Sequence, residues 1–105
     1  MPKYMISYVG TPDHGDAQTQ QRQRQAYMKW LSDLGEAAIS PMNPLKNTVV
    51  MQPDRSRLET SRTTMSGFTI IEAESDQKAY ELIQACPYLD SGGELEISEM
   101  IEMPG

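Results

Sequence analysis

The stretch from Gly67 to Met100 constrains the fold more than any other part of the chain, because it encodes a strand, a helix, a turn and a second strand without interruption. Phe68 to Ala73 is a nearly continuous apolar run of strand length, and Ser75 or Asp76 can cap the helix that follows. We expect Pro87 to stop this helix, because proline lacks the N–H that a helix interior needs. The predicted helix buries a stripe of four residues, Ala79, Leu82, Ile83 and Cys86.

The end of this stretch predicts a last strand. Gly92–Gly93 turns the chain into a segment from Glu94 to Met103. Apolar and polar side chains alternate there, which is typical of a strand with one wet face. The apolar positions are Leu95, Ile97 and Ile101. Two strands with a helix between them form half of a split β-α-β fold.

The amino-terminal part of the chain also leads from a strand into a helix. Lys3 to Val9 is rich in β-branched and aromatic residues and predicts a strand. Asp13 or Asp16 can cap the helix that follows, and Gly35 is placed to end it. The helix is expected to bury residues that share one face, namely Tyr27, Trp30, Leu31 and Leu34.

The middle of the chain carries less regular signals. Ala37–Ile39 could begin a second strand, Pro41 and Pro44 interrupt it, and the β-branched segment Thr48–Met51 could resume it. We therefore expect a broken or bulged strand. Pro53 to Ser66 has no apolar period and several turn formers, which indicates a hairpin arm or a mobile loop.

Together these elements predict an α+β protein in the order β-α-β-β-α-β, which is the ferredoxin-like split motif. Its four-stranded antiparallel sheet carries two helices on one face and leaves the other face open. We expect residues 1–105 to form a single domain, because this length lies within the size of one domain. The open face needs a cover, and a second copy of the chain is the simplest one, so we predict a homodimer.

Three segments of the sequence, GFTIIEA at Gly67–Ala73, ESDQKAYELIQACP and GGELEISEM, resemble the YCII-related (DGPF-domain) family of small ferredoxin-like proteins. A first strand with Tyr or Met, a helix that ends in L-x-x-x-G and a broken second strand that contains N-P-L extend the resemblance over nearly the whole chain. The resemblance implies a ferredoxin-like fold and a homodimer whose two sheets form a dimeric α+β barrel.

Two features of other members of that family are absent from this sequence. Some relatives have a histidine in the first helix and an aspartate before the proline that ends the second helix, a pair proposed as a catalytic dyad. Here the stretch QQRQRQAYMKW contains no histidine, and Cys86 stands before Pro87. SRLETSRTTMSG occupies the hairpin in place of the DGPF sequence. The resemblance therefore favours a protein that is not an enzyme.

Charge and composition argue against several classes of partner. The net charge is −6 and the sequence pI is about 4.6, so we predict no nucleic-acid partner, whose binding relies on clustered Lys and Arg. No segment approaches the roughly 20 apolar residues that span a bilayer, so we expect no membrane partner. The opening residues MPKYMISYVGTPDHG lack the pattern of a signal peptide, and we expect a cytoplasmic protein.

Metal and thiol chemistry are not indicated. Cys86 is the sole cysteine, which excludes an internal disulfide and a thiolate-rich metal site. Its predicted place at the last turn of a helix disfavours the thiolate, so we interpret it as a core residue. The carboxylates near the carboxyl terminus fit a solvated strand, and we predict no metal and no other cofactor. These carboxylates are Glu94, Glu96, Glu99 and Glu102.

His14 is the sole histidine and the candidate catalytic residue. It lies in TPDHGD, between a strand and a helix, where Asp13 or Asp16 could hold its imidazole in one tautomer. A histidine in such a loop could act as a general base. The same residue types are also common in exposed turns, so both interpretations stay open.

Aromatic side chains predict a ligand pocket between the sheet and the first helix. With His14, the candidates are Tyr4, Tyr8, Tyr27, Trp30 and Phe68. Tyrosine hydroxyls would supply the few polar contacts that a small apolar pocket needs. The same rings could equally form the core of a small domain. Eight methionines suit either a loosely shaped cavity or a dimer interface.

Three functions are compatible with these patterns. The first is a homodimeric small-molecule-binding domain without catalysis. The second is a small lyase or dehalogenase-like enzyme, as proposed for some relatives, with His14 as base and Tyr8 or Tyr27 as proton donor. The third is a protein-interaction module in regulation, which the resemblance also allows. We rank the binding domain first, because one histidine and no catalytic motif give little support to a reaction.

Overall fold

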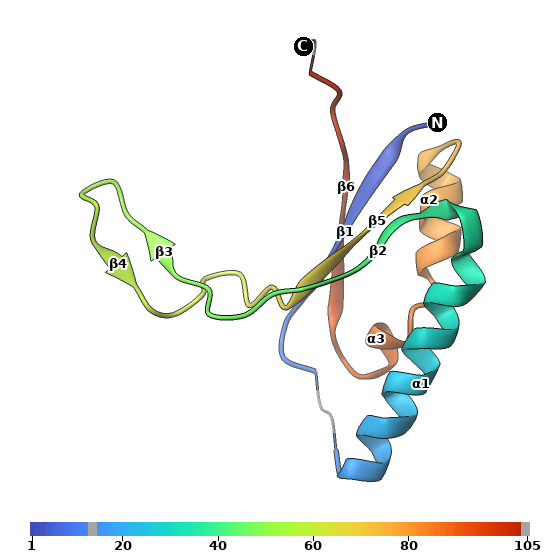
Figure 1. Cartoon of the computed structure of the whole chain (residues 1–105), viewed down its shortest axis with the longest axis horizontal. Coiled ribbons are helices and arrows are strands. Elements are labelled where there is room, and N and C mark those ends of the chain that lie inside the picture. Colours follow the sequence, from blue (N-terminus) through green and yellow to red (C-terminus); the bar gives the residue numbers. More distant parts are fainter. Residues whose placement is uncertain (13–14, 104–105) are drawn as a thin grey trace.

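The structure, a computed structural model, describes residues 1–12 and 15–103. Its main sheet contains four antiparallel strands in the spatial order β2-β5-β1-β6. The strands are β1 (Lys3–Val9), β2 (Ala38–Pro44), β5 (Gly67–Glu72) and β6 (Glu94–Glu99). The helices are α1 (Ala17–Leu34), α2 (Asp76–Ile83) and the short α3 (Pro87–Asp90), and a 3-10 turn, η1 (Gly35–Ala37), follows α1. This arrangement confirms the predicted ferredoxin-like α+β fold (Figure 1).

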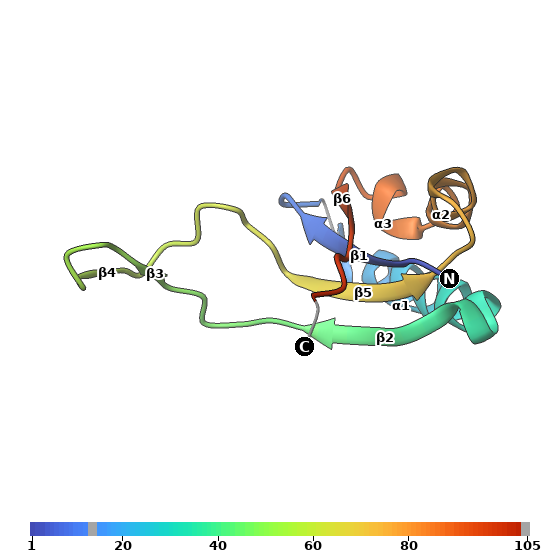
Figure 2. The ribbon, with the colours of Figure 1, turned by 90° about the horizontal axis from the view of Figure 1, so that it is seen from above.

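The core lies between the helices and one face of the sheet (Figures 1 and 2). Side chains alternate across a strand, so β1 directs every second residue to this face. Ile6 of β1 and Ile71 of β5 are fully buried there. The other buried members of the cluster are Tyr4, Tyr8, Trp30, Leu31, Leu34, Ala73, Ala79, Ile83 and Cys86.

Both α1 and α2 begin where the sequence predicts, and α1 also ends there. The Asp16 carboxylate caps α1 by accepting a hydrogen bond from the backbone N–H of Thr19 at 2.8 Å. Gly35 ends α1 with a φ of 57°, a conformation that suits glycine. The Ser75 hydroxyl caps α2 by accepting from the N–H of Lys78. Asp13, the alternative cap for the first helix, lies outside the described residues.

Two predicted boundaries in the carboxyl-terminal half are wrong. Pro87 does not stop the preceding helix, because α2 already ends at Ile83 and Pro87 instead begins α3. Proline is favoured at that first position, where its missing N–H has no partner to lose. The last strand ends at Glu99 rather than Met103, and Ile101 is 82% exposed. The N–H of Met100 still donates to the carbonyl of Lys3, where β1 begins, and the strand does not continue past this point in the described residues.

The second strand differs from the prediction in its course. Pro41 and Pro44 lie within β2 rather than interrupting it, because β2 is an edge strand with an irregular register and one side needs no ladder hydrogen bonds. Thr48–Met51 does not resume this strand. Its last two residues form β3 (Val50–Met51), which pairs only with β4 (Arg57–Leu58) in a separate two-stranded ribbon.

The ribbon of β3 and β4 is the end of a long hairpin, residues 45–66, which we call the arm. Its base is closed where the N–H of Leu45 donates to the carbonyl of Ser66 at 2.9 Å. Figure 1 shows the arm projecting away from the sheet on the side opposite the helices. Of the two predicted alternatives for Pro53 to Ser66, the structure shows the hairpin arm.

The second face of the main sheet is not covered by any helix of the described chain (Figure 2). By strand alternation, this open face carries Met5, Phe68 and Ile70, which are all partly buried. Glu94 and Glu96 of the edge strand β6 point to the same side. An apolar centre with an acidic edge is therefore left available for a partner.

Gly67 sets the distance between β2 and β5. A Cβ atom at this position would lie 2.9 Å from the Asn43 carbonyl oxygen and 3.3 Å from Pro44 Cα.

We expect Gly67→Ala to lower the free energy of unfolding by about 1–3 kcal/mol, since the two backbones must move apart. Urea unfolding checks this. Gly67 has no positive φ, so backbone strain does not contribute, and an unchanged urea midpoint would contradict the steric contact.

Candidate functional site

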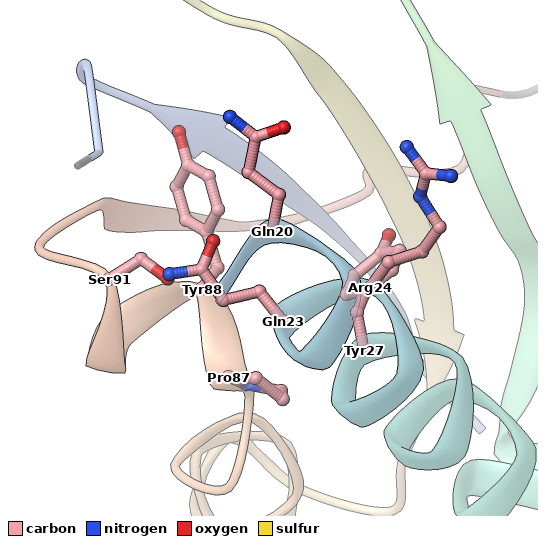
Figure 3. Close-up of a pocket in the computed structure, with 7 residues that line it drawn as sticks. All are labelled: Gln20, Gln23, Arg24, Tyr27, Pro87, Tyr88 and Ser91. Atoms are coloured by element: carbon pink, nitrogen blue, oxygen red, sulfur yellow. The ribbon is translucent and has the colours of Figure 1, made fainter. Parts of the chain in front are cut away.

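Two adjoining cavities open between α1, α3 and the ends of β2 and β5. They share three lining residues, Arg24, Tyr27 and Tyr88. The first has a volume of about 420 Å³ and is completed by Gln20, Gln23, Pro87 and Ser91. Figure 3 shows the glutamines projecting from α1 toward the residues of the α3 segment. The second has a volume of about 410 Å³, and its remaining lining residues are Tyr8, Met28, Met42, Asn43, Pro44, Ser66, Gly67 and Phe68.

A chain of hydroxyl groups runs from the cavities into the protein. The Tyr27 hydroxyl donates to the Tyr8 hydroxyl at 2.9 Å. Tyr8 and Thr69 Oγ1 share a hydrogen bond of 2.6 Å, and Thr69 Oγ1 donates to the backbone carbonyl of Pro41 at 2.7 Å. Each hydroxyl has one proton. Since Thr69 gives its proton to a carbonyl, Tyr8 must donate to Thr69. The oxygen of Tyr27 is then left at the cavity as a hydrogen-bond acceptor.

The tyrosine rings hold one another in place. Tyr8 contacts Tyr27 and Tyr88 edge to face, with ring centroids 5.6 and 5.3 Å apart. The Tyr88 hydroxyl donates to the carbonyl of Val9 at 3.2 Å, which ties α3 to the end of β1. A Cβ atom on Gly93 would overlap the Tyr88 ring, so only glycine leaves room for it.

The charge of the site is opposite to that of the whole chain. Arg24 is the one charged residue that lines either cavity among the described residues. It is exposed, and within the described part of the chain it has no ion pair. An arginine beside a largely apolar cavity, with no carboxylate in the lining, favours an anionic ligand.

Burial controls the acidity of the two core tyrosines. Desolvation raises the pKa of Tyr8 well above its usual value. Desolvation, and then the hydrogen bond to Asp76, raises the pKa of Tyr4 to about 12. Both phenols are therefore neutral at ordinary pH, and the hydroxyl chain keeps its protons.

A family model, the YCII-related domain, matches residues 3–104. The chain belongs to the YCII-related family. No curated protein matches it significantly. Among solved structures, this YCII-related chain is similar to 5-chloro-2-hydroxyhydroquinone dehydrochlorinase (TftG) from Burkholderia phenoliruptrix AC1100, determined in complex with 2,5-dihydroxybenzoquinone. The two share 18% sequence identity with a TM-score of 0.61, over 96% of this chain and 95% of the other. At this identity the likeness establishes the fold alone.

The structure brings some of the predicted pocket residues together in this YCII-related chain and not others. Tyr8 and Tyr27 line the cavities, and Phe68 borders the second, although strand alternation turns its side chain toward the open face. Tyr4 and Trp30 line neither cavity and belong to the core. The Tyr4 hydroxyl donates to Asp76 at 2.8 Å, and Trp30 Nε1 donates to the carbonyl of Leu82 at 3.0 Å. His14 lies outside the described residues.

Sequence reasoning missed Arg24, Tyr88 and Thr69. Arg24 precedes Tyr27 by three positions, a spacing that puts both on one helix face, and this signal was available in the sequence. Tyr88 follows Pro87 in a segment that was expected to be a helix end rather than a helix start. No signal pointed to Thr69, because its role depends on the approach of β2 to β5.

Cys86 is a buried residue, but for a different reason than predicted. It does not lie in the last turn of a helix, since α2 ends at Ile83 and Cys86 directly precedes α3. Desolvation raises the pKa of its thiol to about 11. The thiol is therefore protonated at physiological pH.

Three or more His, Cys, Asp or Glu side chains do not gather anywhere in ranges 1–12 and 15–103 in a way that could hold a metal ion. Within the same ranges, every helix is too short or too polar to cross a membrane.

High pH should destabilise the protein through its core tyrosines. The pKa of Tyr4 is about 12 in the folded state and near 10 in the unfolded chain, so the unfolded state loses its proton first. The stabilising contribution is complete below pH 10 and falls between pH 10 and 12. Urea midpoints at pH 9 and pH 11 should show this loss, and Tyr4→Phe should reduce it. An equal loss in Tyr4→Phe would contradict the assignment.

The space at Gly93 should control the position of Tyr88. We expect Gly93→Ala to displace the ring and to change the near-ultraviolet circular dichroism of the tyrosine cluster, because its Cβ would overlap the ring. Gly92→Ala is the neighbouring control, because it adds backbone strain at a φ of 89° while its Cβ meets no atom within 4 Å. A Gly93→Ala spectrum that matches the wild type would contradict the displacement of the ring.

Proposed function

We propose that this YCII-related protein is a homodimeric small-molecule-binding domain, spanning residues 1–105, that holds a small, planar, hydroxylated anion in the two adjoining cavities. The observation that carries the proposal is the pairing of Arg24, which has no ion pair among the described residues, with a tyrosine oxygen left free to accept. Arg24 and Tyr27 line both cavities and come from the same face of α1. A ligand that touches both must present an anionic group and an O–H or N–H donor.

The apolar part of the lining fits a flat ligand body. Tyr8, Tyr27 and Tyr88 present ring edges and faces, and Met28 and Met42 add adaptable thioether contacts. A volume of about 410 Å³ lies within the ordinary range of small-molecule sites. The fold neighbour was determined with 2,5-dihydroxybenzoquinone, a planar hydroxylated compound of this chemical class.

The hydroxyl chain favours binding over base catalysis. A general base must take up a proton in the reaction and release it again. The chain from Tyr27 ends at the carbonyl of Pro41, and a peptide carbonyl has no proton to give and does not accept one at ordinary pH. Tyr27 therefore acts as a fixed acceptor that orients a ligand hydroxyl. An enzymatic role would need another base, for which His14 is the candidate from the sequence.

A calorimetric titration with 2,5-dihydroxybenzoquinone tests the site. We expect Tyr27→Phe to raise the dissociation constant about three- to tenfold, because one hydrogen bond is lost. We expect Arg24→Gln to raise it about tenfold or more, because a charge-assisted contact is lost. Thr69 still satisfies Tyr8 in Tyr27→Phe, so the fold should remain intact.

Lys29→Gln is the matched control for Arg24→Gln. Lys29 is an exposed cation on the same helix, is paired with Asp33 at 2.8 Å and lines neither cavity. Its replacement should leave the dissociation constant unchanged. If all three variants bind like the wild type, or if the wild type does not bind, the site assignment is wrong. Product formation during the titration that is abolished by His14→Ala would favour the enzymatic alternative.

A further inference from the structure

Among the described residues, the arm is hydrogen-bonded to the body only at its base, where the N–H of Ser66 donates to the carbonyl of Tyr8 and the N–H of Gly10 donates to the hydroxyl of Thr64. A two-stranded ribbon is at best marginally stable in water when nothing packs on it. In the described residues, no hydrogen bond or ion pair joins residues 46–63 to any residue outside the arm. Its apolar side chains are exposed as well, including Val49, Met51 and Leu58. The arm therefore needs a partner to hold it.

The arm is long enough to reach across a second molecule. Each of its sides has about eleven residues, and an extended chain spans roughly 3.3 Å per residue, or about 35 Å in all. A four-stranded sheet is only about 15–20 Å wide at roughly 4.8 Å between strands. Figure 2 shows the arm extending well beyond the main sheet, in the direction away from α2 and α3.

The arm and the main body carry opposite charges. The arm contains four cations and two anions, so its net charge is +2, whereas the chain as a whole is −6 and the remainder is therefore −8. Arg57 and Arg62 have no ion pair among the described residues. Glu94 and Glu96 of β6 are likewise exposed and unpaired there, on the open face.

We infer that the arm of one copy packs on the open sheet face of a second copy, with its arginines against the acidic edge strand β6. This inference rests on the homodimer of the proposed function. By twofold symmetry each copy gives one arm and receives one, so the contact is made twice. The apolar residues of the arm then cover part of the open face, and the opposite charges set its direction and register.

Charge reversal on both sides tests the contact. One variant carries Arg57→Glu and Arg62→Glu, and the other carries Glu94→Lys and Glu96→Lys. Each alone should raise the dimer dissociation constant about tenfold, because two attractive contacts become repulsive in each half of the dimer. All four residues are exposed, so the monomer fold should remain intact. Analytical ultracentrifugation measures the dissociation constants, and circular dichroism checks the fold.

A mixture of the two variants gives the decisive result. In the mixed dimer, the acidic arm of one chain meets the basic face of the other, and the remaining unchanged arm meets an unchanged face. Native mass spectrometry of a 1:1 mixture should therefore show mixed dimers well in excess of both homodimers. Lys78→Glu on α2, away from the open face, is the charge control and should change nothing.

The other outcomes separate the two proposals. Dimers with unchanged dissociation constants and statistical mixing would overturn the arm contact but leave the homodimer and the ligand site in place. A wild-type monomer at all concentrations would remove the homodimer and the arm contact together, whereas the ligand site would still be tested by the titration.

Hydrogen exchange gives a second readout. Arm amides should be protected in the concentrated dimer and should exchange rapidly on dilution, and protection that is independent of concentration would contradict the contact.

Discussion

The buried hydroxyl of Tyr8 is the interaction on which most of this structure depends. Tyr8 is 5% exposed, and a buried hydroxyl without a partner costs free energy, so the protein must supply a hydrogen bond. Thr69 supplies it, and Thr69 in turn is bonded to β2 through the carbonyl of Pro41. One polar group of β1 thus ties together three strands. The ring of the same residue contacts Tyr27 of α1 and Tyr88 of α3, so the sheet and two helices meet on it.

The same constraint shapes the candidate site. Because each hydroxyl has a single proton and the last one is given to a carbonyl, the direction of the whole chain is determined at its buried end. The exposed end at Tyr27 is therefore an acceptor, next to the cation of Arg24. A site with a fixed acceptor and a cation recognises a ligand by complementary charge and geometry. The proposed ligand binding uses these two groups and needs no catalytic motif.

The fold was largely predictable, and the site was not. Asp16, Gly35 and Ser75 mark helix boundaries through local backbone chemistry, which acts over three or four residues and can be read from neighbouring letters. The error at Pro87 has another origin, because a proline fits either the end or the start of a helix. The last strand is shorter than predicted because β1, the strand beside it, begins at Lys3. Of the predicted pocket residues, Tyr4 and Trp30 share the spacing of the lining residues but lie deeper in the core, where Asp76 and Leu82 bind their polar atoms.

The sequence by itself determined the order of the elements, the faces that they bury and the membership of the family. The order and the buried faces follow from periodicity and capping, which are properties of short segments, and the family follows from the match over residues 3–104. Only the tertiary structure decided that Thr69 completes the hydroxyl chain, that Gly93 makes room for Tyr88 and that the basic arm stands away from an acidic body. Each of these joins residues far apart in the chain. Such contacts depend on how strands and helices meet in space, and a pattern within one short segment does not show which distant residues will come together.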